Sequence, residues 1–376
     1  MTQFDLTTPM ASLGDVEAIV RHQLHQLWDS PATATSTAPL MVWGPPGVGK
    51  SSIFQSVCNA EGIELIDIRL AQRDPVDIRG LPVPKDDAVH WLLSADWPRD
   101  PESRGIILFD ELTAADRMLQ VAVYELILDR RLGNLYTLPD GWLVCAAGNR
   151  HEDGAVATAF SSALANRFCH LELMPELPEW VRWAQASGVH PDVIAFLRFR
   201  PECFFSREGC LERGWPSPRS WERVSGVLHA RDRDALTRRS AELMVQGLVG
   251  AATGSELLAF LSWQANVPDV AAMMRGDAEV TIPERADVRY ALCAAAVHEL
   301  WHGADRGSER MLHGFFRVTE ALPSDFATMA MMDALTGPDP ATTRKRAETL
   351  FAHPGFARWS QQHGAAFAAA WDEEAA

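Results

Sequence analysis

A glycine-rich turn between an apolar run and a helical segment is the feature that most constrains this chain. It reads Gly44-Pro45-Pro46-Gly47-Val48-Gly49-Lys50-Ser51, which satisfies G-x-x-x-x-G-K-[ST] in full. The glycines allow backbone N–H groups to turn inward around phosphate oxygens, and the start of the following helix adds partial positive charge. Lys50 would supply a full charge to the β- and γ-phosphates, and Ser51 a hydroxyl to Mg²⁺. The turn therefore predicts a nucleotide-phosphate site at the end of a strand.

Short apolar runs alternate with helical segments through the first 175 residues. The apolar runs span residues 39–44, 63–70, 105–111, 141–149 and 168–174. Helical spacing of apolar side chains marks residues 11–29, 49–60 and 114–130. This alternation predicts an α/β fold with a mostly parallel central sheet.

The strand signals stop at Pro175. Helical segments follow at residues 177–187, 191–199, 219–231, 233–249 and 255–264. A break at Val267-Pro268-Asp269 precedes a further helical stretch with an alanine-rich end. We therefore expect three domains, comprising residues 1–175, 176–268 and 269–376.

Composition narrows the class of partners. The formal net charge is −16, so the chain is not expected to coat a nucleic-acid backbone or an anionic membrane surface. The six cysteines contain no C-x-x-C pair, and no window of 18 apolar residues occurs. The N-terminal residues lack the pattern of a signal peptide. We expect a reduced, cytoplasmic protein.

Polar residues end two of the predicted strands. One buried run leads directly into Asp110 and Glu111, and such carboxylates are costly there unless they hold a ligand or take part in chemistry. Near a phosphate loop, Asp110 would hold the Mg²⁺ hydration shell and Glu111 would polarise an attacking water. Asn149 ends another strand, where it can hydrogen-bond the terminal phosphate and that water. The plainer alternatives are a strand cap and a turn residue.

Together with Arg167 in the segment ALANRF, these motifs resemble the AAA+ ATPases. Segments 66–82 and 138–168 resemble the MoxR-like branch, which includes CbbQ and NorQ and is related to dynein and midasin modules. The resemblance covers residues 12–265. It implies a P-loop AAA+ domain with sheet order 5-1-4-3-2, then a helical lid and a further helical segment. It also implies ATP and Mg²⁺ as cofactors, a hexameric ring, and remodelling of a client protein with a von Willebrand factor A domain partner.

The resemblance also assigns roles to residues. Glu111 falls on Walker B, Asn149 on sensor 1, and Arg167 on the arginine finger that reaches the nucleotide of a neighbouring subunit. Arg150 is the rival finger, and Arg219 in Pro218-Arg219-Ser220 matches sensor 2. Arginine suits phosphate contacts because it stays charged and has a planar fork of donors. The predicted nucleotide-binding residues are Gly44, Pro45, Pro46, Gly47, Val48, Gly49, Lys50, Ser51, Ser52 and Asp110, and the predicted Mg²⁺ residues are Ser51 and Asp110.

Members of this branch carry two insertions that line a ring pore. They correspond to residues 71–104, with Trp91 and Trp97, and to residues 130–142, whose pattern indicates a hairpin with Tyr136. Local packing is the alternative explanation for these aromatic residues.

A second motif points to a different chemistry. His298-Glu299-Leu300-Trp301-His302 matches H-E-x-x-H, the zinc peptidase signature, with Glu320 as a conceivable third ligand. Gly303 follows at once, so the pair would sit in the last turn of a helix, where histidine is favoured anyway. We interpret it as an ordinary packing helix. The alternatives to the ATPase are therefore a nucleic-acid-directed NTPase, a zinc peptidase, and a scaffold that binds nucleotide without turnover.

Overall fold

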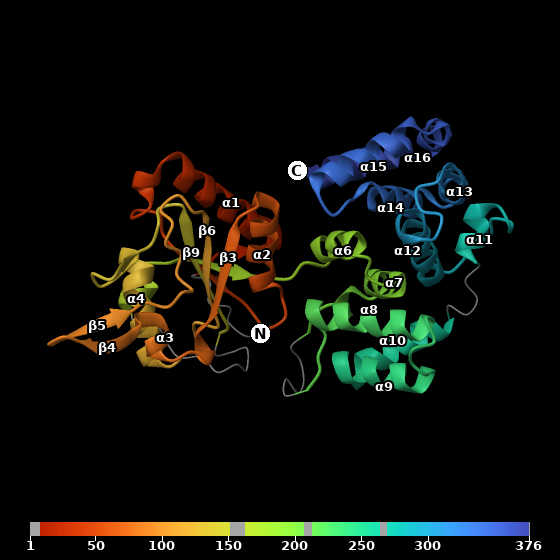
Figure 1. Cartoon of the computed structure of the whole chain (residues 1–376). Coiled ribbons are helices and arrows are strands. Elements are labelled where there is room, and N and C mark those ends of the chain that lie inside the picture. The colour runs from red at the N-terminus through yellow and green to blue at the C-terminus, as the bar shows by residue number, and fades with distance from the viewer. Residues whose placement is uncertain (1–7, 151–161, 207–212, 264–268, 376) are drawn as a thin grey trace. The chain divides into compact units, whose positions relative to one another are not determined.

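Two compact units make up the chain, residues 1–176 and residues 177–376. The computed structural model describes residues 8–150, 162–206, 213–263 and 269–375. Figure 1 gives the element labels used below.

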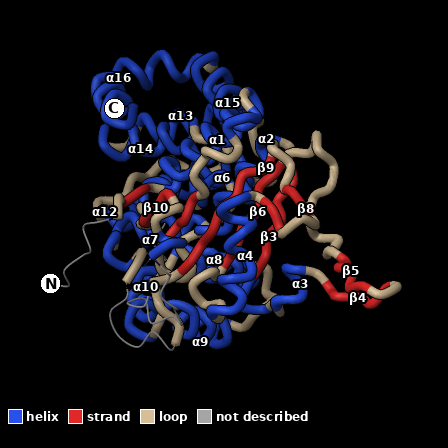
Figure 2. Tube along the Cα trace, turned by 90° about the vertical axis from the view of Figure 1, so that its left-hand side faces the viewer, coloured by secondary structure: helices blue, strands red, loops and turns tan. Residues whose placement is uncertain are grey.

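The first unit is built on a parallel sheet of six strands in the order β1-β10-β2-β9-β6-β3. Strands are drawn in red in Figure 2, where β3, β6, β9 and β10 of this sheet are labelled. Strands β2, β6 and β9 are buried over most of their length, because a parallel sheet is covered on both faces. The strands are β1 (Met10–Ala11), β2 (Leu40–Trp43), β3 (Glu64–Arg69), β6 (Gly105–Asp110), β9 (Trp142–Gly148) and β10 (Cys169–Leu173).

The observed strand order differs from the predicted order 5-1-4-3-2. The difference is the edge strand β1, which pairs with β10 and was not expected from the sequence. The other five strands do follow the predicted order. A strand of two residues has no periodicity to detect, and only its pairing with Glu172 and Leu173 defines it.

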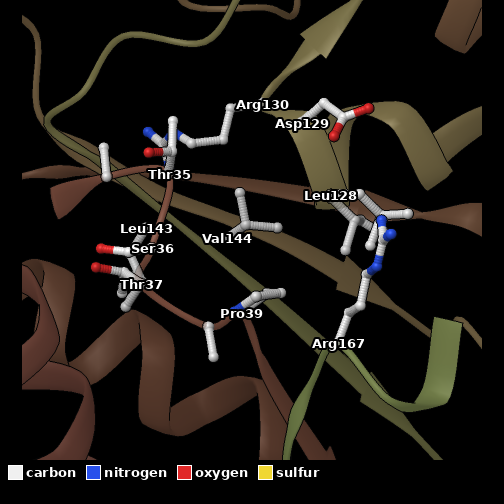
Figure 3. Close-up of a pocket in the computed structure, with 13 residues that line it drawn as sticks. Thr35, Ser36, Thr37, Pro39, Leu128, Asp129, Arg130, Leu143, Val144 and Arg167 are labelled. Atoms are coloured by element: carbon white, nitrogen blue, oxygen red, sulfur yellow. The ribbon is translucent and has the colours of Figure 1, made fainter. Parts of the chain in front are cut away.

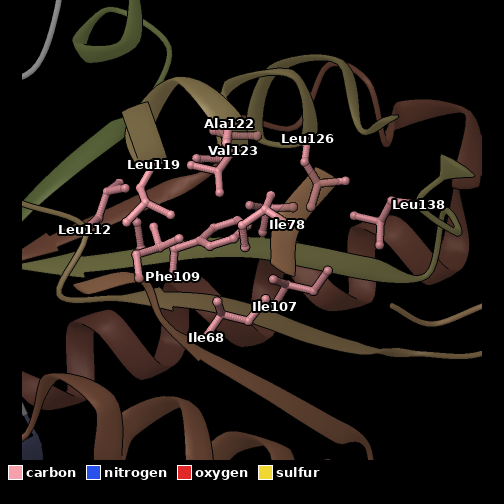
Figure 4. Packing of buried hydrophobic residues seen from close by; sticks show 14 of the residues in the cluster. Ile68, Ile78, Ile107, Phe109, Leu112, Leu119, Ala122, Val123, Leu126 and Leu138 are labelled. Atoms are coloured by element: carbon pink, nitrogen blue, oxygen red, sulfur yellow. The ribbon is translucent and has the colours of Figure 1, made fainter. Parts of the chain in front are cut away.

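Helices cover both faces of this sheet. Helix α4 packs its buried residues, including Leu119, Val123 and Leu126, onto Phe109 and Ile107 of β6 (Figure 4). Helices α1 and α2 contact each other and the sheet strands on the opposite side of the sheet from α4 (Figure 1). The helices of this unit are α1 (Leu13–Asp29), α2 (Lys50–Glu61), α3 (Pro75–Arg79), α4 (Arg117–Asp129) and α5 (Ser162–Ala165).

Two antiparallel hairpins fall within the two predicted insertions. One consists of β4 (Leu81–Lys85) and β5 (Ala88–Leu92), and the other of β7 (Arg131–Leu132) and β8 (Tyr136–Thr137). The β4–β5 hairpin is exposed along nearly its whole length and projects from the sheet (Figures 1 and 2). Trp97 and Tyr136 are buried in the core, so local packing accounts for both.

The second unit is helical throughout its described residues. Its two apolar clusters are centred on α7 with α8 and on α12 with α13 and α14. Ala291 and Ala294 of α12 pack into the first cluster, so residues beyond the predicted boundary at 268/269 share a core with residues before it. The predicted break at Val267-Pro268 lies outside the described residues.

The helices of this unit are α6 (Leu177–Ala186), α7 (Pro191–Phe199), α8 (Pro218–Asp232), α9 (Arg238–Val249), α10 (Ala251–Trp263), α11 (Val270–Arg275), α12 (Ala286–His302), α13 (Glu309–Glu320), α14 (Ser324–Leu335), α15 (Pro340–Ala352) and α16 (Pro354–Ala375). No helix among the described residues combines the length and the apolar character needed to cross a membrane. The five described cysteines are free thiols, and Cys210 lies outside the described residues.

Candidate functional site

The glycine-rich turn connects β2 to α2, as its sequence predicts. Gly44, Gly47 and Gly49 have φ angles of 151°, 82° and 103°, a region that side chains with a Cβ rarely adopt. A Cβ on Gly44 would lie 2.9 Å from the carbonyl oxygen of Leu173. Helix α2 begins at Lys50 without a side-chain cap, so its first N–H groups are available to an anion. The turn is therefore shaped for phosphate oxygens.

Lys50 connects two of the predicted motifs. Its ammonium is buried and donates to the carbonyl oxygens of Gly44 at 2.7 Å and Pro45 at 2.9 Å. It also donates to Oδ1 of Asn149 at 2.8 Å. The backbone of Asn149 is fixed in place because its N–H donates to Oγ1 of Thr113 at 3.1 Å. A charged group and an amide that are far apart in sequence thus meet at the carboxyl ends of β2 and β9.

The hydroxyl of Ser51 donates to Oδ2 of Asp110 at 2.7 Å. The other oxygen of Asp110 accepts from the backbone N–H of Glu111 at 2.9 Å. Glu111 itself has φ 55°, and its side chain is exposed beside the turn. A hydroxyl and a carboxylate in contact form the kind of oxygen-donor set that Mg²⁺ prefers, so these residues fit that ion.

A third carboxylate, that of Asp67, lies near the same carboxyl ends of the strands. The sequence did not lead us to predict it as a site residue. Asp67 lies on β3 two residues before the residue paired with Asp110. Burial raises the pKa of Asp67, and the charges of Asp110 and Glu111 raise it further, while Arg69 opposes them. The mutual repulsion favours a cation at this edge. Its signal in the sequence is a charged residue within the apolar run 63–70.

The remaining predicted residues have different surroundings. Val48 is buried beneath the turn, whereas Ser52 is exposed on α2. Arg150, the rival finger, forms an ion pair with Glu172 at 2.6 Å. Arg219 is the second residue of α8, beside the capping box of Ser217 and Ser220, and belongs to the second unit. Its contact with a γ-phosphate stays a prediction.

Arg167 lies near the amino ends of β10 and β2, whereas the phosphate loop follows the carboxyl end of β2. It is exposed and precedes β10, whose first residue, Cys169, pairs with Leu40, the first residue of β2. The loop follows the last residue of β2, and strands of four or five residues span about 13–17 Å. Arg167 is thus separated from Lys50 of its own chain by the length of the sheet.

The H-E-x-x-H histidines lie in a row of four imidazole rings. Ring centroids are 5.3 Å apart for His298 and His302, 6.4 Å for His229 and His298, and 4.8 Å for His190 and His229. The Nε2 of His302 is 3.1 Å from the carbonyl oxygen of Gln185. Within the described residues, no group of three or more His, Cys, Asp or Glu side chains is placed to hold a metal ion. The zinc alternative therefore lacks a ligand set there.

Comparison with known proteins adds little to this geometry. No protein-family profile matches the chain. Among solved structures, the chain is similar to NtrX from Brucella abortus in complex with ADP, with 16% sequence identity and a TM-score of 0.35. The match covers 87% of this chain and 68% of NtrX. A TM-score this low does not establish a shared fold.

Proposed function

We propose that this chain is a Mg²⁺-dependent ATPase of the AAA+ class, in the MoxR-like branch. The observation that carries the proposal is the cluster formed by Lys50, Asn149, Ser51 and Asp110, where the strongest sequence motif and two strand ends converge. Glycine conformations that favour inward N–H groups support the same reading.

The residues suggest how hydrolysis would proceed. Lys50 would exchange its bonds to the Gly44 and Pro45 carbonyls for phosphate oxygens. Ser51 and Asp110 would hold Mg²⁺, which when bound neutralises charge on the phosphates. Glu111 would orient the attacking water, and Asn149 would hold both that water and the terminal phosphate.

The position of Arg167 supports assembly into a ring. Since it lies a strand's length from the loop of its own chain, a phosphate contact requires the loop of another subunit. An arginine acting between subunits makes hydrolysis depend on assembly. We propose a homo-oligomeric ring, most simply a hexamer, with Arg219 acting within each subunit.

The β4–β5 hairpin supports a protein client. Leu81, Val89, Trp91 and Leu92 are between 43% and 61% exposed on it, with the paired Leu81 and Leu92 on one face and Val89 and Trp91 on the other. We propose that this hairpin contacts the client, and that a von Willebrand factor A domain protein is the further partner. With a net charge of −16, a nucleic-acid client is disfavoured.

Nucleotide turnover by purified variants tests the proposal. Lys50→Ala and Glu111→Gln should each lower ATP hydrolysis at least 100-fold, because they remove the phosphate charge and the water-orienting carboxylate. Lys345→Ala, at an exposed lysine of α15, is the matched control and should retain full turnover.

Three results would contradict the proposal. Turnover that survives both substitutions would place hydrolysis elsewhere, and ATP binding without turnover in the unchanged chain would indicate a scaffold. Stimulation by DNA or RNA would favour the nucleic-acid alternative. Capture of a bound protein by the Glu111→Gln variant with ATP would identify the client.

A further inference from the structure

The two arginines near the ends of β10 have different surroundings. Arg167 precedes β10 and borders a cavity of about 360 Å³ at the amino ends of β2 and β9, which Arg130 also lines (Figure 3). Arg150 instead contacts Glu172, which is the residue before the last of β10. Of the two, Arg150 therefore lies at the end of the sheet that carries the phosphate loop.

The ion pair of Arg150 and Glu172 crosses the end of β2. The guanidinium of Arg150 is 2.6 Å from a carboxylate oxygen of Glu172. Arg150 follows β9, Glu172 belongs to β10, and β2 lies between these two strands in the sheet. Neighbouring strands are about 4.8 Å apart, so the pair spans about 10 Å. It thus joins two strand ends that are not neighbours in the sheet.

Both side chains of this ion pair are largely shielded from water. The exposed fraction is 20% for Arg150 and 11% for Glu172. Because water and salt compete less with a shielded pair, it holds its geometry more firmly than an exposed one. Removing one partner leaves the other charge desolvated and alone, whereas changing both at once costs much less.

Each end of this ion pair is next in sequence to a residue of the phosphate site. Arg150 directly follows Asn149, the amide of that site. Glu172 directly precedes Leu173, whose carbonyl oxygen leaves no room for a Cβ on Gly44. A displacement of either end would therefore move the amide relative to the phosphate loop.

The end of β10 that carries Glu172 is itself fixed to β2. Trp43, the last residue of β2, is the register partner of Glu172. The indole Nε1 of Trp43 donates to Nδ1 of His170 on β10 at 2.8 Å. The Nε2 of His170 lies 2.7 Å from the carbonyl oxygen of Ala165. Side chains as well as backbone pairing thus hold the two strands together, and the ion pair ties the residue after Asn149 to them.

We propose that Arg150 and Glu172 are positioning residues that keep Asn149 at the terminal phosphate and the attacking water. This inference rests on the proposed ATPase function. When Lys50 turns to phosphate oxygens, Asn149 loses its bond to that ammonium. The ion pair, together with the bond from the Asn149 N–H to Thr113, then holds the backbone in place. Because Glu172 engages the charge of Arg150, this role differs from that of an arginine finger.

ATP turnover and nucleotide binding by variants of the full chain test this role. Arg150→Gln and Glu172→Gln should each lower kcat about 10-fold or more, because small misplacements of an orienting group are costly. Calorimetric binding of a non-hydrolysable ATP analogue should change by less than about 2-fold, since the phosphate loop is intact. Combining both substitutions should slow turnover no further than either one does, because the two side chains act as a unit.

Two further variants separate positioning from folding. Arg21→Gln removes an ion pair with Glu61, between α1 and the end of α2, and should keep kcat within about 2-fold of the unchanged chain. Arg150→Glu combined with Glu172→Arg reverses the pair and should recover turnover relative to either single variant. Thermal unfolding followed by circular dichroism reports the stability of every variant.

Several outcomes would overturn the proposal. Unchanged kcat in Arg150→Gln is one, and equal losses of kcat and of analogue binding are another. A loss in Arg150→Gln without a loss in Glu172→Gln would mark Arg150 as a direct phosphate contact. A charge-reversed chain that folds but stays as slow as the single variants would also contradict it.

The unchanged chain distinguishes this inference from the proposed function. If it hydrolyses no ATP, the proposed function fails and this inference fails with it. If it hydrolyses ATP and loses turnover in Lys50→Ala but not in Arg150→Gln, only the positioning role is wrong.

Discussion

At the scale of single residues, the site depends on positions where only one residue type fits. Gly44, Gly47 and Gly49 have positive φ angles that favour glycine, and the φ of Gly44 is 151°. Lys50 is buried where three oxygen atoms accept its hydrogen bonds. Such residues could be singled out from the sequence, because the motif itself expresses these local requirements.

Gly44→Ala should be destabilising as well as inactivating. The added Cβ would meet the Leu173 carbonyl oxygen at 2.9 Å, on a backbone that alanine disfavours. We expect a loss of about 2–4 kcal/mol in the free energy of unfolding, measured by urea denaturation.

Gly226→Ala is the matched control, because a Cβ there meets no atom within 4 Å. It lies inside α8, where alanine is favoured over glycine by about 0.5–1 kcal/mol. A Gly44→Ala chain as stable as the unchanged one would show that the turn relaxes freely.

At the scale of elements, helices α7, α8 and α12 bring two further histidines beside the pair of the H-E-x-x-H motif. The ring of His298 on α12 lies beside His302 of its own helix and beside His229 of α8, and His229 in turn lies beside His190 at the start of α7. His190 is in turn 2.7 Å from Asp232, beside Arg231 and Asp192. Burial, with the other three histidines, lowers the pKa of His298 to about 4.

This pKa predicts acid sensitivity of the second unit. Because unfolding returns the pKa of His298 to its ordinary value near 6.5, the unfolded chain binds the proton more readily. The contribution of neutral His298 to the free energy of unfolding should be fully present above pH 6.5. It should fall by up to about 3 kcal/mol as the pH drops toward 4.

Urea denaturation from pH 7 to pH 4 measures this slope. His298→Gln should flatten it, whereas His313→Gln, at an exposed histidine of α13, should leave it unchanged. Equal slopes in all three chains would contradict the assignment to His298.

At the scale of the whole molecule, each unit has apolar clusters of its own. One cluster lies around the parallel sheet, and the other two lie among the helices of residues 177–376. A unit with its own core can fold without the rest of the chain.

Residues 1–176 and 177–376 should therefore each fold when produced alone. We expect cooperative thermal unfolding of both fragments, followed by circular dichroism. Cutting at 268/269 instead should leave residues 269–376 poorly folded, because Ala291 and Ala294 of α12 would lose the cluster around α7. Cooperative unfolding of 269–376 alone would instead support the three-domain division.

Local patterns in the sequence were sufficient to predict the α/β class, the glycine-rich turn between a strand and a helix, and the strands that end at Asp110 and just before Asn149. Periodicity and turn chemistry are properties of neighbouring residues, so they can be recognised without coordinates. Tertiary structure alone decided the edge strand β1, the place of Asp67 beside Asp110, the burial of Trp97, and the cavity shared by Arg130 and Arg167. These depend on contacts between residues far apart in the chain, where burial determines the cost of each charge.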